Sequence, residues 1–126
     1  MFKRIDHVEL ITSDLERAVR FYSEILGFKV KERKKVDHPP MEEIVFLQLN
    51  DTLLELISGK APAPAPAERW RVGYRMMAME VEDMDRAVEY LKGKGVEISQ
   101  EPVVLGTSKR GEMKDPDGNI LELRQW

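Results

Sequence analysis

Three residues of this sequence have side chains that can bind a metal ion or transfer a proton: His7, Glu55 and Glu122. All three lie in predicted strands. His7 lies in the stretch IDHVELI and is one of two histidines, whereas the chain has no cysteine. Disulfides, thiolate nucleophiles and cysteine-based zinc sites are therefore excluded. Glu55 and Glu122 each stand in an otherwise apolar stretch, TLLELIS and ILELRQW. A carboxylate that points into a protein interior is costly without a partner, so both glutamates are candidates for a functional role.

An internal repeat relates the two halves of the chain. When YRMMAMEVEDMDRAVEYL is laid over IDHVELITSDLERAVRFY without a gap, Asp83 falls on Asp14 and both are followed by the same Arg-Ala-Val triplet. In the same superposition Met76 falls on His7. One copy therefore carries a good metal ligand and the other a thioether at the corresponding position.

Each half reads as the same series of elements. A short strand precedes an amphipathic helix that Asp14 or Asp83 can cap, and a glycine ends each helix before a second strand. Two further strands follow, which turn at Asn50 in the first half and at DPDGN in the second. In DPDGN, Gly118 is expected to take a positive φ and to set the register of the last strand. The pattern predicts an α+β protein made of two βαβββ modules.

The stretch APAPAPA, residues 61–67, has proline at every second position. It is incompatible with a helix or a central strand and should form an extended, semi-rigid connector. We therefore expect one domain that consists of module 1–59, a proline-rich linker 60–69 and module 70–126.

Strand alternation decides which side chains share a face of each module. Leucines that flank Glu55 and Glu122 should lie under the helices, which leaves both glutamates on the opposite face. The same alternation places His7 and Met76 on the helix-free face. All four residues therefore occupy corresponding places in the two halves.

With these motifs, the chain resembles the vicinal oxygen chelate superfamily, which includes glyoxalase I, methylmalonyl-CoA epimerase, extradiol dioxygenases, and bleomycin and fosfomycin resistance proteins. The resemblance rests on IDHVELITSDLERAVRFYSEILGFKV, GYRMMAMEVEDMDRAVEYLKGKGV and DPDGNILEL. It implies paired modules that form a cupped, barrel-like mixed sheet with the helices outside. It also implies metal ligands at His7, Glu55, Met76 and Glu122. Glyoxalase I and the epimerase have histidine where Met76 stands, so Met76 is expected to be a weak or lost ligand.

The resemblance implies two classes of function. The first is a glyoxalase I-like or epimerase-like lyase or isomerase that uses a divalent metal (Zn, Ni, Co or Mn), with Glu122 or Glu55 as the base that moves a proton alpha to a carbonyl. The alternative is a non-catalytic small-molecule binding protein that resembles bleomycin-resistance proteins. An extradiol dioxygenase is the weakest option, because its iron site needs a second histidine.

Simpler interpretations stand beside each assignment. The glutamates could instead form salt bridges with Arg124 or with basic residues of a partner chain. Met76 could be a residue of the hydrophobic core. His38 is expected to be a loop residue, with replacement of a missing ligand as the other option. If the metal hypothesis is correct, histidine in place of Met76 should strengthen metal binding.

Composition limits the partners. The chain has 126 residues, a net charge of −3 and no apolar run close to the length of a membrane span. We therefore expect no binding to nucleic acid or membrane, a small-molecule substrate or ligand, and a cytoplasmic location. Two modules in so short a chain leave apolar sheet surface to cover, which predicts a homodimer.

Overall fold

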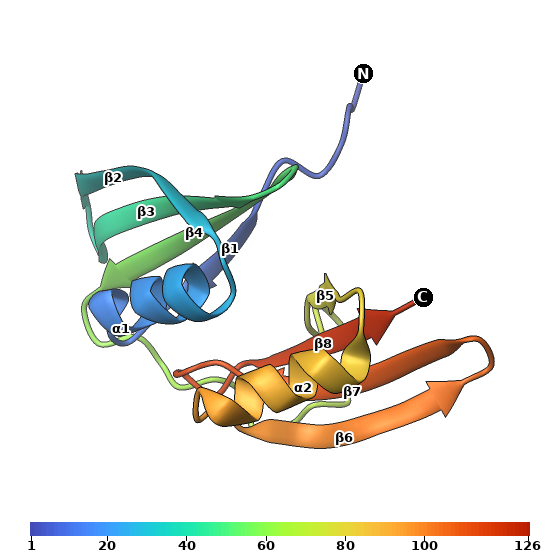
Figure 1. Ribbon diagram of the computed structural model, residues 1–126. Helices are drawn as coiled ribbons and strands as arrows, with labels where there is room; N and C mark the ends of the chain where they lie inside the picture. The colour runs from blue at the N-terminus through green and yellow to red at the C-terminus, as the bar shows by residue number, and fades with distance from the viewer. The chain divides into compact units, whose positions relative to one another are not determined.

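A computed structural model describes residues 1–126, and these divide into two compact units (Figure 1). The first unit is Met1–Pro64 and the second is Ala65–Trp126. The boundary falls inside the proline-rich stretch.

The first unit is a four-stranded sheet with one helical segment. Its elements, in chain order, are β1 (Val8–Ile11), α1 (Leu15–Arg20), the π-helix η1 (Phe21–Ile25), β2 (Lys29–His38), β3 (Met41–Leu49) and β4 (Thr52–Gly59). The strand order is β1-β4-β3-β2, with β1 parallel to β4 and the other pairs antiparallel. The helical segment lies along one face of this sheet (Figure 1), and Tyr22, Leu54 and Leu56 are fully buried.

The second unit repeats this arrangement. Its elements are β5 (Ala78–Glu80), α2 (Met84–Gly93), β6 (Ile98–Leu105), β7 (Ser108–Lys114) and β8 (Ile120–Gln125). The strand order is β5-β8-β7-β6, again with the first pair parallel. Met84 on α2 and Leu121 and Leu123 on β8 are buried in its core.

The predicted α+β fold with two βαβββ modules is confirmed, and neither four-stranded sheet closes on itself. The module boundaries 1–59, 60–69 and 70–126 stay predictions. None of the helices has the length and apolar character needed to cross a membrane.

The residues predicted to start the helices do so. The side chain of Asp14 accepts a hydrogen bond from the backbone N–H of Arg17 at 3.1 Å, and Asp83 accepts one from Arg86 at 3.0 Å. Each bond satisfies one of the backbone donors that a helix leaves unpaired at its N-terminus. The repeat in the sequence is therefore also a repeat in local structure.

The DPDGN turn fixes the start of β8. Asp115 accepts hydrogen bonds from the backbone N–H groups of Asp117, at 3.0 Å, and Asn119, at 2.8 Å. Gly118 has a φ of 83°, as the sequence predicts, and this region is unfavourable for residues with a Cβ. Glu122 follows four residues later, so the turn sets the direction in which its side chain points.

Gly118→Ala tests the turn. A Cβ added at Gly118 or at Gly93, which lies in α2, would meet no atom within 4 Å. The two sites therefore differ in backbone conformation and not in space. Gly118→Ala should lower the free energy of unfolding by about 1 kcal/mol. Gly93→Ala should leave it unchanged or raise it by up to about 1 kcal/mol, because alanine favours a helix. Urea denaturation measures both, and equal effects would contradict a role for the positive φ.

Candidate functional site

His7 lies just before β1 and is surrounded by carboxylates. Its Nδ1 is 2.8 Å from Oδ2 of Asp6, and its Nε2 is 3.2 Å from Oε2 of Glu55 and 3.3 Å from Oε1 of Glu9. The ring also makes an edge contact with Phe46, with centroids 5.5 Å apart. The imidazole is therefore held between one carboxylate on one side and two on the other.

This arrangement requires a positive charge at Nε2. When Nδ1 donates its proton to Asp6, the Nε2 of a neutral ring presents a lone pair to two carboxylate oxygens, which is repulsive. A proton on Nε2 removes the repulsion, and a metal ion would do the same. In agreement, the hydrogen bond to Asp6, followed by Glu9 and Glu55, raises the pKa of His7 above its ordinary value.

Glu55 is positioned by the sheet. It lies in β4 opposite Glu9 of β1 on one side and Phe46 of β3 on the other. Its side chain is 10% exposed, whereas that of Glu9 is 59% exposed. Burial, and then the charge of Glu9, raises the pKa of the Glu55 carboxyl despite the opposing effect of His7. Glu55 is therefore a more basic carboxylate than an exposed one.

The cluster suits a divalent metal ion. His7, Glu9 and Glu55 each offer one ligand atom, and these atoms lie within 4.8 Å of one another. With a neutral imidazole the three groups carry two negative charges, and the ion-pair partner of Glu55 is His7 rather than an arginine or lysine. Asp6 bonds the second ring nitrogen, which is the usual arrangement behind a metal-ligating histidine. The donor set therefore fits Zn²⁺ and similar ions.

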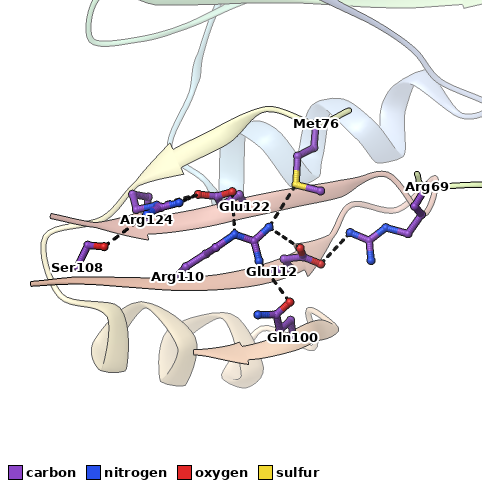
Figure 2. A network of polar contacts seen from close by, with 8 residues as sticks. All are labelled: Arg69, Met76, Gln100, Ser108, Arg110, Glu112, Glu122 and Arg124. Atoms are coloured by element: carbon purple, nitrogen blue, oxygen red, sulfur yellow. Dashed lines mark hydrogen bonds and ion pairs between the residues drawn. The ribbon is translucent and has the colours of Figure 1, made fainter. Parts of the chain in front are cut away.

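The corresponding carboxylate of the second unit has a different partner. Glu122 accepts a hydrogen bond at Oε2 from Nε of Arg110, at 3.0 Å, and at Oε1 from Nε of Arg124, at 2.8 Å (Figure 2). Side chains of all three are at most 21% exposed. Two guanidinium groups thus supply the positive charge that this partly buried carboxylate needs.

Arg110 also bonds a second carboxylate, that of Glu112, which lies two residues further along β7. Its Nη2 is 2.6 Å from Oε1 of Glu112, and Oε2 of Glu112 is 3.0 Å from Nη2 of Arg69. In the strand ladder Glu112 faces Glu122 and Arg110 faces Arg124, so directly opposed residues carry like charges. The ion pairs avoid this repulsion because Arg110 reaches diagonally to Glu122. The result is a chain of alternating charges from Arg69 to Arg124 (Figure 2).

Met76 lies beside Arg110. Its Sδ is 4.0 Å from Nη2 of Arg110, so the guanidinium is next to both Met76 and Glu122 (Figure 2). A divalent ion near these two groups would have to compete with a cation that is already hydrogen-bonded there. The thioether and the arginine-paired carboxylate are therefore a poor site for a metal ion.

The structure groups the predicted residues in pairs. His7 and Glu55 are in contact in the first unit, and Met76 and Glu122 both adjoin Arg110 in the second. His38 is exposed at the end of β2 and pairs with Met41 in the sheet. The salt bridge of Glu122 to Arg124, one of the simpler interpretations, is present.

Sequence reasoning missed Glu9 as a ligand candidate and missed both Arg110 and Glu112. The stretch SKRGEMK contains the signal for the last two, because Arg110 and Glu112 alternate with residues on the buried side of β7. Two opposite charges at alternate positions of a strand predict polar side chains on one shared face.

Comparisons with known proteins agree with this fold. The sequence pattern that defines the "Glyoxalase/Bleomycin resistance protein/Dioxygenase superfamily" matches residues 4–123. The chain is 32% identical to lactoylglutathione lyase of Neisseria meningitidis, over 97% of this chain and 90% of that protein. It is 29% identical to human mitochondrial methylmalonyl-CoA epimerase, over 97% of this chain and 73% of that protein.

A solved structure is also similar. The glyoxalase family protein from Enterococcus faecalis superimposes with a TM-score of 0.86, at 28% identity and with 98% of both chains covered. Similarity over this much of both chains means that both βαβββ modules are shared.

Glu112→Gln tests the charge network through its pH dependence. Burial raises the pKa of Glu112, but Arg110 and Arg69 outweigh this effect and hold the pKa below its usual value. A carboxyl with a lowered pKa in the folded protein stabilises it above the unfolded pKa, and this stabilisation is lost as pH falls through the folded pKa. Glu112→Gln should therefore lower the free energy of unfolding by about 2 kcal/mol at neutral pH.

The difference between Glu112→Gln and the unchanged protein should shrink as the pH falls from the ordinary carboxyl pKa of about 4 through the lower pKa of Glu112 in the folded protein, where the native carboxylate is neutralised. Urea denaturation at a series of pH values measures it. Glu97→Gln is the control, because Glu97 makes an exposed ion pair with Lys114 and should matter little. A loss of stability that is independent of pH would contradict the electrostatic account.

Proposed function

The chain belongs to the glyoxalase/bleomycin resistance protein/dioxygenase superfamily, and on this basis we propose that it is a metal-dependent lyase or isomerase. The proposed reaction moves a proton alpha to a carbonyl group of a small molecule. One observation carries the proposal: in the first unit an imidazole nitrogen faces two carboxylates, and the ligand atoms of all three groups lie within 4.8 Å of one another. The similarity to lactoylglutathione lyase and methylmalonyl-CoA epimerase supports this class of reaction.

We propose His7 and Glu55 as metal ligands, with Glu9 as a third. A divalent ion (Zn, Ni, Co or Mn) held there would act as a Lewis acid toward the carbonyl oxygen of the substrate. Asp6 fixes the ring of His7 through Nδ1, so that Nε2 faces Glu55 and Glu9.

Glu55 is the proposed base. Its carboxylate removes the proton from the carbon next to the carbonyl and returns it to a carbon of the same substrate, so the protein ends the reaction unchanged. In the metal-free protein, burial raises the pKa of the Glu55 carboxyl. To act as the base when an ion is bound, Glu55 would need one carboxylate oxygen free of the ion, so that this oxygen could accept the proton.

The assignment of Glu122 as ligand or base, and of Met76 as a weak ligand, stays a prediction from the family resemblance. Arg110 and Arg124 occupy both oxygens of Glu122, so a metal or a substrate proton would have to displace a charged hydrogen bond. The partner of Glu55 is His7, whose exchangeable proton a metal ion can replace, so Glu55 is preferred.

A second function is favoured by the arginine network. A family member that only binds a small molecule, as bleomycin-resistance proteins do, has no need for a free carboxylate base. The engagement of Glu122 by two guanidinium groups, next to the thioether of Met76, agrees with such a role.

Proton exchange distinguishes the two functions. The zinc- or nickel-loaded protein is incubated in D₂O with methylmalonyl-CoA or with the hemithioacetal of methylglyoxal and glutathione, and deuterium at the alpha carbon is followed by NMR. We expect exchange with at least one substrate. Glu55→Gln should reduce its rate by at least about 100-fold, because the base is lost. Glu24→Gln, a change on the outer helical segment η1, is the matched control and should have no effect.

Exchange that survives in Glu55→Gln would contradict the assignment of the base. The absence of exchange with both substrates, together with measurable binding of either, would favour the binding protein.

We also propose that the chain forms a homodimer. Several large apolar side chains are exposed in each unit, including Ile5 and Ile11 in the first and Trp70 and Trp126 in the second. Apolar surface of this kind is commonly covered by association. Light scattering at micromolar concentration should give twice the mass of the 14.6 kDa chain, and a monomer would contradict the proposal.

A further inference from the structure

The second unit contains a small pocket that the proposed reaction does not use. Its volume is about 110 Å³, and its lining includes Arg69, Arg71, Tyr74, Arg75 and Met76. The loop of the DPDGN turn, at Gly118 and Asn119, forms another part of its wall. The pocket therefore joins the irregular segment before β5 to the start of β8.

The charges of this pocket are unbalanced. Three guanidinium groups line it against a single carboxylate, that of Glu68, which accepts a hydrogen bond from the backbone N–H of Trp70 at 2.9 Å. Arg71 and Arg75 make no hydrogen bond or ion pair with other residues of the chain. Their donors are available to a ligand.

Arg69 is held in place by the charge network. Its Nη2 bonds the buried carboxylate of Glu112 at 3.0 Å, and Glu112 is in turn held by Arg110 (Figure 2). A guanidinium group has five N–H donors, so Arg69 keeps donors that face away from Glu112. Because Glu112 fixes its position before a ligand arrives, Arg69 loses less side-chain entropy on binding.

We infer that this pocket binds the phosphate group of a small molecule. Guanidinium groups are planar, weakly hydrated and always charged, and they bond phosphate oxygens in pairs. Three of them around one pocket match a dianionic phosphate better than a singly charged carboxylate. The pocket is small, so the rest of such a ligand would extend beyond it. All residues of this site belong to the second unit, so phosphate binding there is independent of metal binding at His7.

Calorimetric titration of the metal-free protein at low and constant ionic strength tests the inference. The probes are inorganic phosphate, phenyl phosphate and acetate at pH 7.5. We expect saturable binding of phosphate and phenyl phosphate in the millimolar range or tighter, and weaker binding of acetate by about tenfold or more. Tighter binding of phenyl phosphate than of phosphate would identify an ester as the ligand, and equal binding would identify free phosphate.

Arg71→Gln and Arg75→Gln should each weaken phosphate binding by about fivefold to tenfold, because each removes one charged donor pair. Both side chains are exposed and unpaired, so the variants should fold, and their melting temperatures without phosphate should be unchanged. Arg86→Gln, on α2, makes the same charge change outside the pocket and should bind phosphate normally.

Three results would overturn the inference. These are the absence of saturable phosphate binding, an equal loss of binding in Arg86→Gln, and acetate binding as tight as that of phosphate. Failure of proton exchange or of metal binding would leave the phosphate result unaffected.

Discussion

A carboxylate on the helix-free face of each sheet, buried in the first unit and partly buried in the second, is the constraint on which the rest of this structure depends. Glu55 and Glu122 lie at corresponding positions of the two modules, and each needs a positive partner because burial of an unpaired carboxylate is costly. The first unit offers the imidazole of His7 together with a second carboxylate, Glu9. The second unit offers the guanidinium groups of Arg110 and Arg124. The same backbone position is thus neutralised in two different ways.

These two solutions have different chemical consequences. A guanidinium group stays charged at all ordinary pH values, so the network around Glu122 is a permanent structural arrangement that orders its neighbours. An imidazole between carboxylates holds its positive charge as an exchangeable proton, and a metal ion competes for the same place. The arrangement around Glu55 therefore supports the proposed metal-dependent chemistry, and the arrangement around Glu122 supports the proposed recognition of phosphate by arginine side chains. The two units differ in this way because one copy of the repeat has His7, whereas the other has Met76 at the corresponding position and Arg110 beside it.

Much of the fold and part of the site could be predicted from the sequence. The repeat and the apolar alternation around Glu55 and Glu122 identified two βαβββ modules and the face on which these carboxylates lie, because these properties depend on local periodicity. The partners of Glu122 could be predicted only in part. Arg124 is two residues away on the same strand, whereas Arg110 comes from the neighbouring strand, and its diagonal reach depends on register and on side-chain rotamers. Glu9 lies two residues after His7, on the face that strand alternation assigns to both, so its approach to His7 could have been predicted.

Titration of the metal-free protein with Zn²⁺ tests the central claim most directly. Binding is compared by calorimetry for the unchanged protein, His7→Ala and Glu122→Gln. If the positive charge needed at Glu55 is supplied by a metal and that needed at Glu122 by arginine, the unchanged protein and Glu122→Gln bind one ion per chain with similar affinity. His7→Ala then loses binding by about 100-fold or more. Loss of binding in Glu122→Gln that equals the loss in His7→Ala, with both variants folded, would contradict this account.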